Sequence, residues 1–130
     1  MINAVIYYDN PVNGCKCGDG NSAKGIIKGY IIDGHAGMDD PGYDLVCASV
    51  SVLAQTALLG LDAYLSKNAK WEIREEGYME CWLPDGLRDE EMDKAQVILN
   101  TMELGLLSIV ESYGQYLKVS RRRWTKCCSK

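Results

Sequence analysis

The stretch GIIKGYIIDGHAGMDDPGYDLVCASVSVL, residues 25–53, decides the fold that we expect for this chain. It opens with β-branched and aromatic residues, which predict a strand from Gly25 to Asp33. A loop rich in glycine and aspartate follows, and Asp44 then serves as the predicted N-cap of a helix that runs to about Lys67. This helix is apolar on nearly every side, so we expect it to be central in the fold.

The rest of the chain supplies more strands and a second helix. Strands are predicted over residues 2–8, 71–74, 78–83 and 116–120. The second helix begins near Asp89, and its apolar residues step by three and four along one packing face: Met92, Ala95, Leu99, Met102, Leu106, Ile109 and Tyr113. The order ββαββα(β) predicts a two-layer α+β domain with two helices packed on one face of a small sheet. We assign residues 1–120 to this domain and residues 121–130 to a basic, flexible tail.

Composition excludes several functional classes. The chain has 130 residues, 47% of them hydrophobic, which fits one compact domain. A formal net charge of −4 gives no overall basic field, so we expect no direct binding of nucleic acid. The uncharged run 45–61 falls short of a membrane span, and the N-terminal residues lack an export signal. We therefore expect a cytoplasmic protein without a membrane partner.

The six cysteines are expected to be reduced thiols in such a chain. Cys15, Cys17, Cys127 and Cys128 make a four-thiolate zinc site arithmetically possible. A C-x-C pair and an adjacent C-C pair do not have the usual C-x2-C spacing of such sites, however, so we expect no metal and no cofactor. Cys81 falls in a predicted strand and is expected to be a core thiol.

One histidine and one cysteine flank the loop between the predicted strand and helix. His35 follows the strand, and Cys47 lies in the predicted first turn of the helix, where the positive end of the helix favours a thiolate. An imidazole beside a thiol can take its proton and later protonate the leaving amine. The pattern alone also allows Cys47 to be a buried core thiol and His35 an ordinary loop residue.

Two neighbours of Cys47 are candidates for supporting roles. Ser51 lies one helical turn further along and is expected on the same side of the helix. Asp44 is available to orient an imidazole as well as to cap the helix. Its negative charge opposes formation of a thiolate unless His35 is protonated.

These residues resemble the motif of a known family. The residues concerned are Gly34-His35-Ala36, then Gly42-Tyr43-Asp44-Leu45-Val46-Cys47-Ala48, then Ser51, and they are similar to the motif of the ribosomal-processing cysteine proteases called Prp. The segment 95–102 resembles the second helix of that family, and the element order agrees from residue 1 to about 120. The loop 10–24 and the tail after residue 120 depart from the family pattern.

The resemblance implies a cysteine endopeptidase that acts as a homodimer. Its substrate would be a large-subunit ribosomal protein made with an N-terminal extension, which is removed after a short motif containing phenylalanine. His35 and Cys47 match the catalytic pair of the family, and Asp44 and Ser51 match its supporting residues. The adaptable substrate loop would include these residues: Gly34, Ala36, Gly37 and Gly42.

Two other functions remain open from the sequence. The chain could be a non-catalytic ribosome-associated module whose basic tail contacts RNA, with His35 and Cys47 serving structure. It could also be a thiol redox protein, although Cys47 lacks the second cysteine of a C-x-x-C motif.

Overall fold

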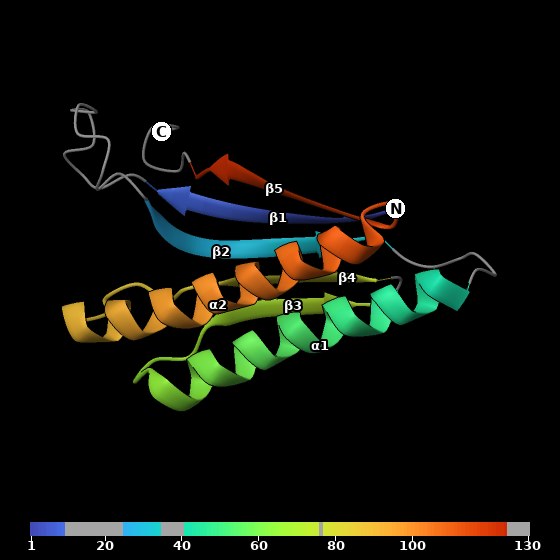
Figure 1. The fold of residues 1–130 in the computed structure, drawn as a ribbon. Helices are drawn as coiled ribbons and strands as arrows, with labels where there is room; N and C mark the ends of the chain where they lie inside the picture. Colours follow the sequence, from blue (N-terminus) through green and yellow to red (C-terminus); the bar gives the residue numbers. More distant parts are fainter. Residues whose placement is uncertain (10–24, 35–40, 76, 125–130) are drawn as a thin grey trace, which may run out of the picture.

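The computed structural model describes residues 1–9, 25–34, 41–75 and 77–124. Two helices lie on one face of a five-stranded mixed sheet (Figure 1), which confirms the predicted α+β class and element order. Along the chain the elements are β1 (Ile2–Asp9), β2 (Ile26–Asp33), α1 (Pro41–Tyr64), β3 (Lys70–Arg74), β4 (Tyr78–Trp82), α2 (Asp89–Tyr113) and β5 (Leu117–Arg123).

The strands lie side by side in the order β3-β4-β2-β1-β5. All neighbours are antiparallel except β1 and β5, which are parallel. The register lines up residues in rows across the sheet, and successive rows face opposite sides. One row that faces the helices consists of Trp71, Cys81, Tyr30, Ile6 and Arg121. The next row faces away from the helices and consists of Lys70, Trp82, Gly29, Tyr7 and Arg122.

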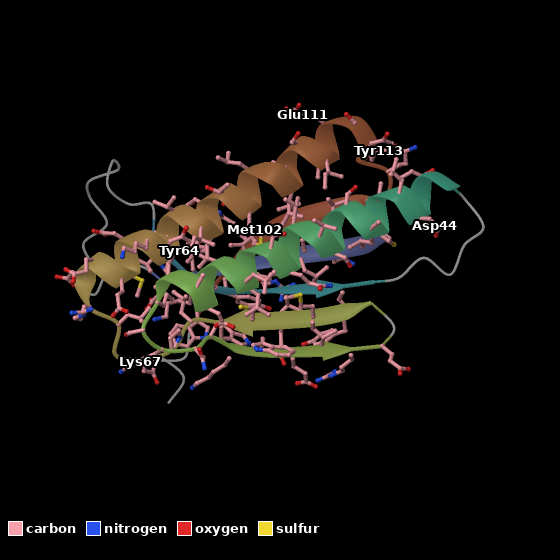
Figure 2. All side chains as sticks on the ribbon, turned by 90° about the horizontal axis from the view of Figure 1, so that it is seen from below. Asp44, Tyr64, Lys67, Met102, Glu111 and Tyr113 are labelled. Atoms are coloured by element: carbon pink, nitrogen blue, oxygen red, sulfur yellow. The ribbon has the colours of Figure 1, made fainter. Side chains whose placement is uncertain are left out.

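The core lies between the sheet and the two helices, which Figure 2 shows in front of β1 and β2. Alternate residues of β1 enter it, namely Ile2, Ala4 and Ile6. Cys81 is fully buried, as predicted for a core thiol, and burial raises its pKa to about 11. The Tyr30 hydroxyl donates a hydrogen bond of 2.7 Å to the Ala54 carbonyl of α1, so the polar tip of this buried ring is satisfied.

Helix α2 begins at Asp89 as predicted, and its apolar spacing has the expected result. Ala95, Leu99, Met102 and Leu106 are buried, and the remaining residues of the predicted face pack against the core. At its first turn, Glu91 accepts hydrogen bonds from the backbone N–H groups of Ser66 at 2.7 Å and Arg88 at 3.2 Å. This carboxylate therefore ties the end of α1 to the beginning of α2.

Helix α1 corrects three predictions. It begins at Pro41 and ends at Tyr64, so Asp44 lies in its first turn and is not the N-cap. Proline suits this first position because its missing N–H would have no partner there. The helix is not central, because it covers the sheet from one side and leaves Val52 and Leu59 62% and 68% exposed. Its segment Asp44–Tyr64 is also long and apolar enough to cross a membrane, so the expectation that this run falls short of a membrane span is wrong. One side of the segment, with Val46, Val50 and Leu61, is buried in the core.

The C-terminal boundary also differs from the prediction. Strand β5 continues to Arg123, and the Trp124 backbone N–H donates a hydrogen bond of 2.7 Å to the Tyr8 carbonyl. Arg121 forms two bonds with the Glu103 carboxylate of α2, at 2.6 and 2.8 Å. The prediction of a flexible tail from residue 121 is therefore wrong for residues 121–124, because backbone pairing with β1 and the ion pair with α2 hold this segment in place. Residues 125–130 lie outside the described part of the chain.

Candidate active site

A cleft opens between α1 and the β3–β4 hairpin, on the helix-covered side of the sheet. It has a volume of about 340 Å³. Its walls are largely apolar and come from β1, β2, α1, β3 and β4, together with the residue after β2 and the β3–β4 turn: Ile2, Ile32, Gly34, Cys47, Val50, Ser51, Ala54, Gln55, Ile73, Arg74, Glu75, Gly77, Tyr78 and Met79. An apolar cleft of this size with a few polar groups is typical of a ligand site.

Cys47 and Ser51 line this cleft from neighbouring turns of α1. The Cys47 side chain is half-buried and free, while Ser51 is exposed. Figure 2 labels Asp44 at the same end of α1, and this is also the end of the molecule at which the β3–β4 hairpin turns. The candidate nucleophile thus faces an apolar space that is open to a substrate.

The pKa of the Cys47 thiol is raised from its usual value of 9.0. Burial is the main cause, and the nearby Asp44 carboxylate adds to it because a negative charge opposes a thiolate. Since α1 begins at Pro41, Cys47 is beyond the first turn, where the helix dipole and the unpaired N–H groups act. The predicted activation by the helix end is therefore corrected: the described surroundings disfavour the thiolate.

Gly34 connects β2 to the segment that carries His35. Its φ of 129° is a conformation that residues with a side chain rarely adopt. A Cβ at this position would lie 2.6 Å from the Met1 carbonyl oxygen and 2.8 Å from Ile2 Cα. Only glycine lets the chain leave β2 beside the cleft in this direction.

The other residues of the predicted substrate loop are only partly described. His35, Ala36 and Gly37 lie outside the described residues. Gly42 belongs to the first turn of α1, so the loop that we expected to reach Tyr43 gives way to a helix at Pro41.

The sequence did not identify the residues of the opposite cleft wall. Ile73, Tyr78 and Met79 come from the β3–β4 hairpin, and Ile73 remains 47% exposed. Arg74 is held at the rim by Glu72 at 2.7 Å and lies 4.3 Å from the centre of the Tyr78 ring. The alternating pattern predicted the hairpin itself, but no local pattern shows which helix a hairpin faces.

Metal binding finds no support in the part of the chain that is described, which holds no group of three or more potential metal ligands. Cys15, Cys17, Cys127 and Cys128, the cysteines weighed for zinc, all lie outside it.

The fold and the cleft define a small α+β protein that presents a free thiol to an apolar, substrate-sized space, as cysteine proteases do. The chain belongs to the family Cysteine protease Prp, whose profile matches residues 20–118. It is accordingly an enzyme, a cysteine protease.

Relatives agree with this assignment. The ribosomal processing cysteine protease Prp of Bacillus subtilis is 31% identical over 98 residues, which cover 75% of this chain and 87% of that protein. The protein of the same name from Staphylococcus aureus is 28% identical over 106 residues, covering 75% of this chain and 89% of that protein.

Solved structures share the fold. A Streptococcus mutans crystal structure superposes with a TM-score of 0.73 at 22% identity and covers 95% of this chain and 96% of its own. The S. aureus protease Prp in complex with a substrate peptide gives 0.71 at 24% identity, covering 94% of this chain and all of its own.

Proposed function

We propose that this protein is an endopeptidase that removes the N-terminal extension of a large-subunit ribosomal protein, with Cys47 as nucleophile and His35 as base. The observation that carries the proposal is the placement of Cys47, a half-buried free thiol on the wall of an apolar cleft. Gly34, the residue before His35, lines the same cleft. The relatives named above are ribosomal processing proteases, which supports the choice of substrate.

The chemistry follows the usual division of labour between a thiol and an imidazole. His35 takes the Cys47 proton, and the thiolate sulfur attacks the carbonyl carbon of the scissile peptide bond. The carbon–nitrogen bond breaks, and the imidazolium gives its proton to the leaving amine. Water, deprotonated by the same imidazole, then attacks the thioester carbon, and the carbon–sulfur bond breaks. The imidazolium returns its proton to the sulfur, and the acid product leaves as a carboxylate after releasing its proton to solvent.

The remaining site residues act on the substrate and on His35. The Ser51 hydroxyl lies one turn from Cys47 and is placed to hydrogen-bond a substrate backbone group in the cleft. Asp44 orients His35 in its charged form and stabilises it after proton transfer. The apolar walls, including Ile32 and Met79, accommodate an apolar substrate side chain such as phenylalanine.

The test is cleavage of the tailed ribosomal protein of the same organism by the purified enzyme. Mass spectrometry should show one new N-terminus in the wild-type reaction and none with Cys47→Ala. The matched control is Ser49→Ala, on the same helix, because its hydroxyl bonds the Leu45 carbonyl and does not line the cleft. Cleavage by Cys47→Ala at the wild-type rate would refute the assignment of the nucleophile.

We also propose that the enzyme is a homodimer of the cytoplasm. The outer surface of the two helices, which we call the helix-layer face, exposes large apolar residues: Leu45, Val52, Leu59, Val97, Leu104 and Leu107. No charged residue occurs between positions 45 and 61, so the α1 part of this face favours contact with another uncharged surface. The same face of a second copy of the chain is such a surface. The free thiols of Cys47 and Cys81 suit a reducing compartment.

A further inference from the structure

The face of the sheet that points away from the helices carries an ordered row of cations and aromatic rings. The strand register aligns Lys70, Trp82, Gly29, Tyr7 and Arg122 across all five strands, in that order. We call this set the aromatic row. It has an aromatic residue on each side of a central glycine and a cation at each end. These residues come from five separate segments of the chain, so no local sequence pattern shows the row.

The glycine of the aromatic row allows its rings to lie close to the sheet. A Cβ on Gly29 would fall 2.3 Å from Trp82 Cε3, which means that the indole lies directly over this residue. The Tyr7 ring packs beside it, with ring centroids 5.2 Å apart. The indole N–H of Trp82 donates a hydrogen bond of 3.0 Å to Glu80, which sets the orientation of the ring.

A hollow of about 160 Å³ lies beside the aromatic row. Its walls are Trp82 and Trp124 together with Lys28, Lys70, Leu83 and Asp85. The Lys28 ammonium lies 5.0 Å from the centre of the Trp124 ring. Two indoles and two ammonium groups therefore border one small space, which is suited to a flat ring that is joined to an anion.

We propose that this surface binds single-stranded RNA. Bases stack on the exposed rings of a sheet, and their phosphates pair with lysine and arginine at its rim. Arg122 and Lys118 provide such cations along β5, on the same side as the aromatic row. The expectation of no nucleic-acid binding rested on the net charge of the whole chain, which does not report how charges are distributed.

Several carboxylates lie on this side of the sheet, of which Asp33 and Asp9 stand in other rows of the register than the aromatic row. Glu80 is engaged by Trp82, and Glu72 is engaged by Arg74 at 2.7 Å. Asp85 lines the hollow, where it can accept a hydrogen bond from the exocyclic amino group of a base but repels a phosphate. The backbone of the RNA is therefore expected to follow β5, with one base in the hollow.

The cleft with Cys47 lies on the opposite side of the sheet, on which Met79 and Ile32 form its floor. RNA and a peptide substrate can therefore occupy the protein together. Binding of RNA does not depend on the proposed protease activity, and the two are separable by experiment.

The test is fluorescence anisotropy of a labelled twelve-nucleotide RNA of mixed sequence, titrated with the full chain at several salt concentrations. Trp82→Leu should weaken binding roughly 5- to 100-fold through loss of stacking. Arg122→Gln, at an exposed position, should weaken binding severalfold and reduce the slope of log affinity against log salt by about 1. Neither change should alter cleavage of a peptide substrate, since neither residue lines the cleft.

Matched controls come from the rest of the chain. Trp71→Leu removes an exposed indole from the helix side of the sheet, and Lys94→Gln removes an exposed cation from α2; both should bind RNA like the wild type. Equal affinity for an abasic strand of the same length, or unchanged affinity in Trp82→Leu, would show attraction of a polyanion without base stacking and would overturn the proposal. So would the absence of binding at roughly 50 mM salt, because contacts between cations and phosphates are strong at such a low ionic strength.

Discussion

Cys47 is a thiol whose described surroundings resist its ionisation. Both burial and the Asp44 carboxylate raise its pKa, so the proposed mechanism requires the positive charge of a protonated His35. The relation of Cys47 to Ser51 was predictable because four residues make about one helical turn, and both side chains do line the cleft. The prediction that Asp44 caps the helix was wrong, because the helix begins earlier, at Pro41.

Replacement of Asp44 should separate two of its effects. Asp44→Asn removes the negative charge near Cys47, so the pKa of the thiol should fall and alkylation by iodoacetamide at pH 7 should become faster, by roughly two- to fivefold. Peptide cleavage should nevertheless slow if Asp44 orients His35, as proposed above. Asp93→Asn, an exposed change on α2, is the control. Equal alkylation rates in wild type and Asp44→Asn would contradict the electrostatic part of this account.

A side chain at Gly34 should damage the site and the fold together. Gly34→Ala places a Cβ against the Met1 carbonyl at a positive φ, and we expect a loss of about 1–3 kcal/mol in the free energy of unfolding, with a larger loss in kcat/KM. Urea unfolding and peptide cleavage measure the two effects. Gly60→Ala is the matched control, since its nearest neighbour atom would be 3.5 Å away on Ile98 and alanine should stabilise the helix by about 0.5–1 kcal/mol.

The elements differ in how well their own sequences predict them. Helix α2 has an acidic first turn and an unbroken apolar spacing, so its first residue and its buried face were both predictable. Strand β5 was underestimated because three consecutive arginines look like a solvated tail, whereas pairing with β1 and the Glu103 carboxylate hold Arg121 in place. Tertiary contacts of this kind leave no trace in local propensity.

Truncation should locate the true end of β5. Removal of residues 121–130 eliminates the Arg121–Glu103 pair and the bond from Trp124 to Tyr8, and leaves a largely buried carboxylate without its cation. We expect a loss of about 2–4 kcal/mol in the free energy of unfolding, measured in urea. Removal of residues 125–130 alone is the control and should cost less than about 0.5 kcal/mol. Equal stability of the two truncated chains would contradict the assignment of β5.

Glu91 should make the stability of the α1–α2 junction depend on acid. Hydrogen bonds from Ser66 and Arg88 lower its pKa from 4.5 to about 2. The charged form is therefore favoured in the folded state, and its contribution is complete above pH 4.5 and is lost as the pH falls toward 2. Glu91→Gln should be less stable than wild type at pH 7, and the difference should shrink between pH 4.5 and 2 in thermal melts. Glu90→Gln removes a neighbouring charge that does not bond Ser66, and a similar pH profile for that variant would argue against this explanation.

At the scale of the whole molecule, the layers were predictable and the cleft was not. Alternation in the strands and the apolar stripe of α2 require one sheet with helices on one side. The far wall of the cleft depends on where the β3–β4 hairpin lies relative to α1, which is decided by the strand order and by contacts between residues far apart in the chain. For the same reason, the exposed apolar side of α1 became visible only in the folded protein.

The helix-layer face leads to a prediction about assembly. Val52→Glu and Leu104→Glu each place a charge on this face, so each should convert the proposed dimer to a monomer in light scattering at micromolar concentration, with at least a tenfold weaker association, or roughly 1.4 kcal/mol. Trp71→Glu, on the exposed edge strand β3, makes the same kind of change elsewhere and should leave the dimer intact. A wild-type protein that is monomeric under these conditions would exclude the dimer.

The parallel pairing of β1 with β5 has a consequence for the order of events during synthesis. Ile2 lines the cleft, yet it is aligned with Leu117 and donates its backbone N–H to the Tyr116 carbonyl. A nascent chain that has emerged only as far as α2 lacks these contacts, so we expect the Ile2 side of the cleft to be held less firmly at that stage. We therefore expect proteolytic competence to appear only after the last strand of the sheet has left the ribosome.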